Sequence, residues 1–124
     1  MANGKENVIA TKSLAFALRI INLYKYLVGK NEIVLARQIL RSGTSIGANC
    51  REARNAQSRL DFISKLNIAL KEADETAYWL ELLKEGDFID QQSYESIFND
   101  CDELVKLLTS IIKSNKKKMN IDIY

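Results

Sequence analysis

Four stretches of this chain repeat apolar residues at alternating steps of three and four positions. Such spacing places the side chains along one side of an α-helix. Kept over several turns, it is the heptad spacing of helices that pack in a left-handed bundle. The second stretch shows it clearly, at Ile33, Ala36, Leu40, Gly43, Gly47 and Cys50. Because the sequence contains no proline, the strongest helix breaker, we expect an all-α fold built from long helices.

The four stretches set the expected order of elements. Ser58 and Asp90 stand where N-caps are needed, and Gly29 and Gly86 stand where helices should stop. Long helices joined by short turns form an antiparallel up-down-up-down four-helix bundle, so we predict one domain over residues 1–124. We predict helices at about residues 8–28, 32–55, 59–85 and 90–115. A basic tail at residues 113–124 is expected to be either disordered or docked on a partner subunit.

The first predicted helix carries two adjacent apolar stripes. One consists of Leu14, Leu18, Ile21, Tyr24 and Val28. The other consists of Phe16, Ile20, Leu23 and Leu27. A helix that is apolar on two neighbouring sides is expected to have more than one packing partner.

Two features have a structural and a functional interpretation. Gly43 and Gly47 inside a helix each cost about 1 kcal/mol relative to alanine, so they indicate the close approach of a neighbouring helix. The alternative, a phosphate-binding loop, lacks the Gly-Lys-Ser/Thr sequence and the preceding strand that such loops have. Trp79 lies beside the central stripe of the third helix, where it either covers the core edge or anchors a subunit contact.

A polar line accompanies the apolar one on the second helix. It comprises Ser45, Asn49 and Glu52, opposite Asn67, Glu72 and Glu75 of the third helix. A pair of Glu side chains could serve acid–base chemistry or bind a metal. No nucleophile, histidine or phosphate loop accompanies them, so we interpret the line as a hydrogen-bonded structural layer that fixes helix register.

The residue types present argue against an enzyme. The chain has no histidine, which excludes Ser-His-Asp and Cys-His catalysis and the Glu-x-x-His ligands of di-iron bundles. We therefore expect no catalytic residue, cofactor or metal. Cys50 and Cys101 fall among apolar positions and are expected to be buried thiols. No signal peptide or membrane-spanning segment is recognisable, so a cytoplasmic protein is expected.

Charge is distributed unevenly along the chain. Residues 1–60 hold ten basic and three acidic residues, whereas residues 61–90 hold three basic and eight acidic ones. Arginines recur on one side of the second helix and just beyond it, and arginine can bind two phosphate oxygens at once. Such a row would bind a nucleic-acid backbone without reading its sequence. The candidate residues are Arg37, Arg41, Arg51, Arg54 and Arg59.

The same charge asymmetry is also compatible with two arrangements that involve no nucleic acid. In the first, the arginines are solvated and paired with acidic residues of their own chain. In the second, the acidic third helix of one copy pairs with the basic first or second helix of the next copy. Such a contact joins two different surfaces and would build a closed ring.

Several segments together resemble a known family. They are Gln38–Leu40, TSIGANCREA at Thr44–Ala53, DFISKLNIALKEADET at Asp61–Thr76, and YWLELL before Gly86. Over about residues 10–112 the chain resembles the bacterial 23S rRNA-intervening sequence proteins, and Asn49 and Glu52 match their Asn-x-x-Glu. The family commonly has Gly next, whereas this chain continues with Ala53-Arg54, which predicts a longer helix.

The resemblance implies a four-helix bundle that assembles into a homopentameric ring. It also implies similarity to the accessory factor of diversity-generating retroelements, which uses a basic ring surface to bind nucleic acid and a reverse transcriptase. Our leading hypothesis is a non-enzymatic oligomer that binds structured RNA or DNA through the arginine row. The alternative is a scaffold for another protein, with no nucleic-acid role.

Overall fold

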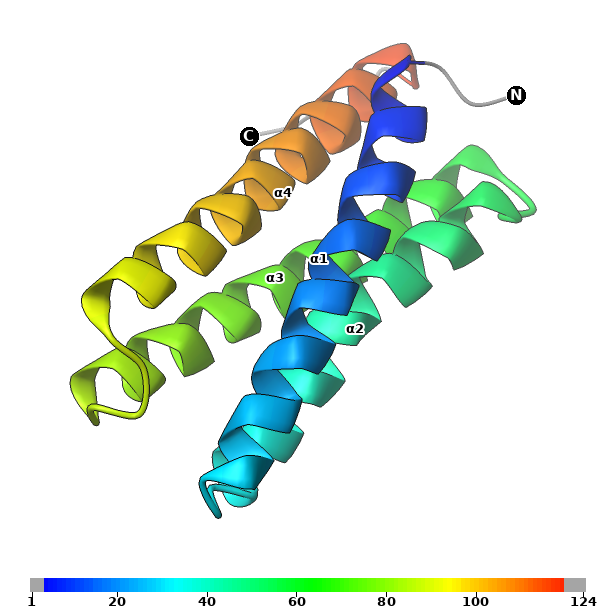
Figure 1. The fold of residues 1–124 in the computed structure, drawn as a ribbon. Helices are drawn as coiled ribbons and strands as arrows, with labels where there is room; N and C mark the ends of the chain where they lie inside the picture. The colour runs from blue at the N-terminus through cyan, green and yellow to red at the C-terminus, as the bar shows by residue number, and fades with distance from the viewer. Residues whose placement is uncertain (1–3, 120–124) are drawn as a thin grey trace.

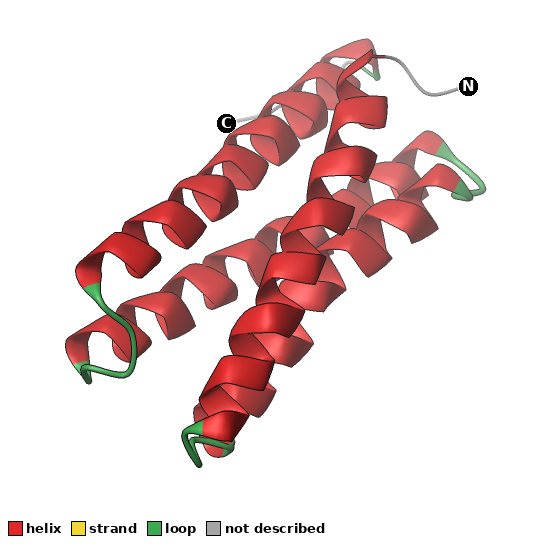
Figure 2. Ribbon diagram, viewed as in Figure 1, coloured by secondary structure: helices red, strands yellow, loops and turns green. Residues whose placement is uncertain are grey.

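The structure is a computed structural model that describes residues 4–119, and all four predicted helices are present (Figure 2). They run antiparallel in up-down-up-down order, which confirms the predicted bundle. α1 begins about one turn earlier than predicted, and α4 continues to the end of the lysine run. The bounds are α1 Gly4–Gly29, α2 Val34–Arg54, α3 Arg59–Glu85 and α4 Gln91–Lys118.

The helix boundaries follow from local hydrogen bonding. Ser58 Oγ accepts from the Asp61 N–H at 3.0 Å, and Asp90 Oδ1 accepts from the Ser93 N–H at 2.7 Å, which confirms both predicted N-caps. The bonds from Ser93 lower the pKa of Asp90 below its ordinary value. α1 and α3 stop at the predicted glycines, but the left-handed backbone conformation falls at Asn31 and Asp87 (φ 65° and 63°).

The basic tail is partly helical. α4 extends through Lys118, so the disordered alternative is wrong for residues 113–118, and docking on a partner subunit stays a prediction. Lysines are good helix formers and suit a helix C-terminus, where their positive charge interacts favourably with the negative end of the helix dipole. Residues 120–124, which complete the predicted tail, lie outside the described residues.

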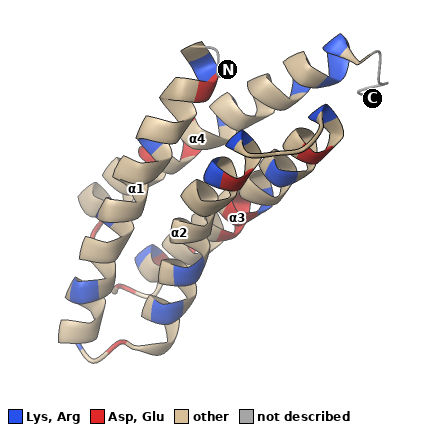
Figure 3. Ribbon diagram, turned by 90° about the vertical axis from the view of Figure 1, so that its right-hand side faces the viewer, with Lys and Arg blue, Asp and Glu red and all other residues tan. Residues whose placement is uncertain are grey.

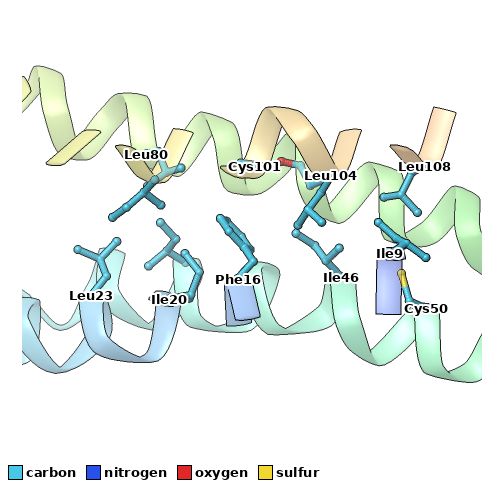
Figure 4. Close-up of a cluster of buried hydrophobic side chains, with 14 of the residues drawn as sticks. Ile9, Phe16, Ile20, Leu23, Ile46, Cys50, Leu80, Cys101, Leu104 and Leu108 are labelled. Carbon is cyan, nitrogen blue, oxygen red and sulfur yellow. Dashed lines mark hydrogen bonds between the residues drawn. The ribbon is translucent and has the colours of Figure 1, made fainter. Parts of the chain in front are cut away.

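The core runs along the inside of the bundle and draws on every helix. Figure 4 shows its middle, where side chains of α1 and α2 point toward those of α3 and α4. The fully enclosed residues include Ile20, Leu27, Ile39, Ile46, Leu80, Leu83 and Leu108. Burial of such side chains supplies most of the stability of a fold this size.

One of the two apolar stripes of α1 is buried in this core, and the other is only partly covered. Phe16, Ile20 and Leu27 are buried, whereas Leu14 and Leu18 are each 56% exposed. The stripe that begins at Leu14 is therefore exposed at its start, whereas Tyr24 and Val28 at its end pack against the core. α1 packs against both α2 and α4, which confirms the prediction that this helix has more than one packing partner.

Gly43 and Gly47 lie where α1 crosses close to α2. A Cβ on Gly43 would come within 2.8 Å of the Ile20 side chain, and one on Gly47 would meet the Ser13 carbonyl oxygen at 3.4 Å. This confirms that the glycines allow a close helix approach. The phosphate-loop alternative is wrong, because α2 is continuous through both positions.

Helices α1 and α4 lie closer together at one end of the bundle than at the other. The start of α1 lies beside the end of α4, where Lys5 Nζ donates to Ser110 Oγ at 2.6 Å. From there the two helices diverge (Figure 1), so α1 and α4 touch less than the other neighbouring helices do. The turn between α2 and α3 lies near the same end, since Arg59 reaches α4 there.

Candidate nucleic-acid interface

Arg41, in the middle of the predicted row, is engaged by the acidic helix α3. Its guanidinium pairs with Glu72 at 3.2 Å and with Glu75. Glu75 also accepts from the indole N–H of Trp79 at 2.9 Å. Arg41 therefore ties α2 to α3, and little of its charge remains for an external phosphate.

Arg37 lies one turn before Arg41, near the start of α2. It is exposed and forms no ion pair with any described residue. It is also separated by almost the whole helix from the arginines at the other end of α2. The structure therefore divides the predicted row of five into separate parts.

Arg51, Arg54 and Arg59 are brought together at the turn between α2 and α3. Arg51 and Arg54 occupy the last turn of α2, where basic side chains suit the helix dipole, and both are exposed. Neither forms an ion pair with a described residue. Arg59 opens α3 and donates to Oδ1 of Asn115 on α4, which is itself buried.

The contact between Arg59 and Asn115 places the lysine run of α4 beside the three arginines. Lys117 and Lys118 are exposed, and Lys116 is half-buried. Figure 3 shows basic residues at the termini of α2 and α4 on this side of the molecule. We call this cluster the basic end; it consists of Arg51, Arg54, Arg59, Lys113, Lys116, Lys117 and Lys118.

Acidic residues near the basic end are already engaged. Glu52 pairs with Lys65 of α3 at 3.4 Å. The carboxylate of Asp61 accepts from the Gln57 backbone N–H at 3.3 Å, within the α2–α3 turn. Neither of these two carboxylates is paired with one of the seven bases. Sequence analysis found the three arginines but missed the lysines, because it treated their segment as a tail.

A shallow groove adjoins this end between α1 and α2. It encloses about 380 Å³, and small or apolar residues line most of it. Leu14 and Ala17 contribute from α1, and Gly47 and Ala48 contribute from α2. Arg51 and Arg54 stand at its rim. These two arginines thus border both the groove and the basic end.

The predicted polar layer has mostly local hydrogen bonds. Ser45 Oγ donates to the Arg41 carbonyl oxygen, and Asn49 Nδ2 donates to that of Ser45 at 2.9 Å. Only Glu52 reaches α3, through Lys65. The buried polar contact between α2 and α3 is instead a hydrogen bond of 2.9 Å from Thr76 to Ser42, which sequence analysis missed.

Trp79 lies half-buried at the edge of the core, and its indole N–H is bonded within its own chain. Its ring also lies 5.2 Å from that of Tyr78, measured between centroids. This position suits a residue that covers the core edge. Its predicted role as an anchor of a subunit contact stays a prediction.

Both cysteines are buried free thiols, as predicted. Burial raises the pKa of Cys50 to about 11, although a hydrogen bond with Ser13 opposes the rise. Burial also raises the pKa of Cys101 to about 12. Both groups are therefore neutral near pH 7 and unsuited to nucleophilic or redox chemistry.

Two further kinds of site are absent from the described part of the chain. Between residues 4 and 119, no three His, Cys, Asp or Glu side chains stand close enough together to hold a metal ion. Within that range, too, no helix has the length and apolarity needed to cross a bilayer.

The basic end has the geometry of a backbone-binding surface. Its cations come from three helices and have few internal partners, so they are available to phosphate oxygens. Two of its arginines can each make a bidentate contact. Contacts of this kind to phosphate oxygens would position a nucleic acid without reading its sequence.

Comparison with known proteins agrees with this architecture. The family model for the 23S rRNA-intervening sequence protein matches residues 5–110. A solved structure from Bacteroides thetaiotaomicron, described as a protein of unknown function from the S23 ribosomal protein family, is 65% identical. The match covers 88% of this chain and 98% of that one, with a TM-score of 0.87. None of the curated proteins matches.

Proposed function

Because this chain belongs to the 23S rRNA-intervening sequence protein family, we propose that it is a non-enzymatic bundle protein that binds the backbone of structured RNA or DNA. The basic end carries the contact. The supporting observation is that Arg51 and Arg54 are exposed and lack ion-pair partners in the described chain, whereas Arg41 is held by two carboxylates.

The number of available cations sets the expected affinity for nucleic acid and its dependence on salt. Each phosphate neutralised by Lys or Arg releases condensed counterions, which makes affinity fall steeply with salt. Seven clustered bases allow about four or five simultaneous phosphate contacts. Such binding is independent of sequence and would discriminate between nucleic acids by their shape.

The proposal includes self-association in the cytoplasm. The resemblance implies a homopentameric ring, in which the basic ends of several copies would act together. Repeated weak contacts on one ligand raise the overall affinity well above that of one copy. The exposed apolar stripe at Leu14 and Leu18 supports an additional contact to α1, and the two free thiols suit a reducing compartment.

The second candidate is a scaffold for another protein with no nucleic-acid role. It is favoured by the groove between α1 and α2, whose apolar lining and arginine rim would suit an acidic amphipathic segment. In that case Arg51 and Arg54 pair with carboxylates and nucleic acid does not compete.

A fluorescence-anisotropy titration separates the two candidates. A labelled RNA hairpin and a DNA duplex of equal length would be titrated with the protein at about 50 and 200 mM salt. With four or five phosphate contacts, affinity should fall by roughly 100- to 1,000-fold between those salts. A protein that binds neither ligand at 50 mM salt would overturn the nucleic-acid proposal and leave the scaffold.

A further inference from the structure

Asn115 occupies a core position near the end of α4 where the spacing of the helix favours an apolar residue. The buried stripe of α4 runs through Leu104, Leu108 and Ile111 at steps of four and three, and the next step of four falls on Asn115. This side chain is only 2% exposed. A buried amide costs stability unless its polar atoms are hydrogen-bonded, so an apolar side chain would serve packing alone better.

Both polar atoms of the Asn115 amide are engaged. Nδ2 donates to the Ile111 carbonyl oxygen at 2.8 Å, one turn back along α4. This bond fixes the plane of the amide and leaves Oδ1 to accept from the guanidinium of Arg59, the first residue of α3. Arg59 is therefore held by an atom whose own position is set by the core.

The partner of Arg59 differs in charge from the partners of other arginines. Among the described residues, Arg19, Arg41 and Arg59 each donate to a side chain of another helix. Arg19 pairs with Asp100 at 2.8 Å, and Arg41 pairs with two glutamates of α3. Carboxylates cancel the charge of those two guanidinium groups. Asn115 is neutral, and Arg59 forms no ion pair with any described residue, so its charge is held in place without being cancelled.

A guanidinium in this state is suited to bind phosphate. It carries several N–H donors, so a bond to one amide oxygen leaves others for phosphate oxygens. Arg59 is exposed, and it lies beside Lys116 and its neighbours in the basic end. A side chain that is already held loses less conformational entropy when it binds.

We propose that Asn115 is a positioning residue of the basic end. It holds the Arg59 guanidinium in place for a phosphate of the nucleic-acid backbone and leaves the positive charge available to that phosphate. This assignment rests on the proposed function, and within it Arg59 makes the contact and Asn115 acts only through Arg59.

Three variants separate the position of the guanidinium from its charge. R59Q removes the cation. N115L removes the bond that holds the cation and keeps the core position apolar. N115D is nearly isosteric, keeps a partner for Arg59, and cancels its charge with a carboxylate. The charge-matched control is N99D, the same change at an exposed residue of the same helix. Circular dichroism checks that each variant stays helical.

The labelled RNA hairpin would be titrated with each variant at several salt concentrations between about 50 and 200 mM. R59Q and N115D should each lower affinity about tenfold at 50 mM salt. Each should also reduce the slope of log affinity against log salt by about one, because one phosphate contact is lost. N115L should lower affinity about threefold to fivefold with an unchanged slope, because the cation is still present but no longer held. N99D should stay within about twofold of the unaltered protein.

Combining N115L with R59Q tests whether Asn115 acts through Arg59. The combined variant should bind like R59Q alone, because there is no guanidinium left to position. If Asn115 served only the packing of the core, N115L would cause the same further loss of affinity in the R59Q protein as in the unaltered one. That result would overturn the positioning role, even with both proteins fully helical.

The remaining outcomes distinguish this assignment from the proposed function. If the unaltered protein binds the hairpin and R59Q and N115D keep its affinity and salt slope, the roles of Arg59 and Asn115 are overturned, and Arg51 and Arg54 still carry the binding. If the unaltered protein does not bind at 50 mM salt, the proposed function fails and this assignment fails with it.

Discussion

The two halves of helix α2 carry arginines in very different surroundings. In the first half, Arg41 faces α3 and is held by Glu72 and Glu75. In the second half, Arg51 and Arg54 are exposed and form no ion pair with a described residue. The arginines are spaced about one turn apart in both halves, and Arg37, in the first half, is exposed and unpaired among the described residues like Arg51 and Arg54. What the next helix places opposite each arginine decides whether its charge is structural or available.

Reversal of the two charges in the second half of α2 should have the largest effect on affinity for nucleic acid. R51E with R54E removes two phosphate contacts, each worth about 1.5–3 kcal/mol as a hydrogen bond to a charged group. Affinity for the RNA hairpin should fall by about 100-fold or more at 50 mM salt, measured by anisotropy. Helicity should be unchanged, since both side chains are exposed and lie in the last turn.

The charge-matched control for this variant is K25E with R37E. It changes the net charge by the same amount, near the far end of the α1–α2 pair. Its effect should stay within about threefold, because exposed charges far apart are largely screened. Equal losses in the two double variants would show that binding follows overall charge and not the basic end.

The fold could be predicted from sequence because it depends on periodic features. The heptad stripes, the N-caps at Ser58 and Asp90 and the glycine stops are all local, and each fixed a helix or its boundary. It was harder to predict which apolar stripe of a helix faces the core. Leu14 and Phe16 belong to equally apolar stripes of α1, and the positions of α2 and α4 together decide which stripe is buried.

The candidate site was predicted less completely, because it is assembled from three helices. Arg51, Arg54 and Arg59 were found by proximity in sequence. Lys116 and its neighbours were missed as partners, since more than fifty residues separate them from Arg59 and only the closing of the bundle brings them together. For Arg41 the structure shows the alternative that the sequence left open, pairing with acidic residues of its own chain, and a contact of Arg41 with nucleic acid stays a prediction.

The glycines of α2 show a second contrast, with a smaller expected effect. Alanine at Gly43 must displace the branched side chain of Ile20, which a Cβ would approach within 2.8 Å. G43A should therefore lower the free energy of unfolding by about 1–3 kcal/mol, the usual cost of overpacking a core. Urea denaturation followed by circular dichroism measures the change.

The matched variant at the second glycine should behave differently. G47A places its methyl group at ordinary contact distance from Ser13, at 3.4 Å. The helix gains up to about 1 kcal/mol from replacing glycine by alanine, so stability should be unchanged or slightly raised. If G47A destabilises as much as G43A, the two crossings are equally tight and the contrast is wrong.

A small loss of stability is expected at Arg41, where the comparison began. R41Q removes the cation that separates Glu72 from Glu75 and leaves Trp79 bonded to a carboxylate without its counter-charge. Half-exposed ion pairs contribute about 0.2–1 kcal/mol each, so urea denaturation should show a loss of about 1 kcal/mol. The loss of stability should shrink in 0.5 M salt, because salt screens the repulsion that remains between the two carboxylates.

The affinity of R41Q for the RNA hairpin should stay within about twofold of that of the unaltered protein, since this guanidinium is occupied within the chain. An affinity loss as large as that of R51E with R54E would mean that Arg41 leaves α3 to bind phosphate, and the two halves of α2 would then form one binding surface after all.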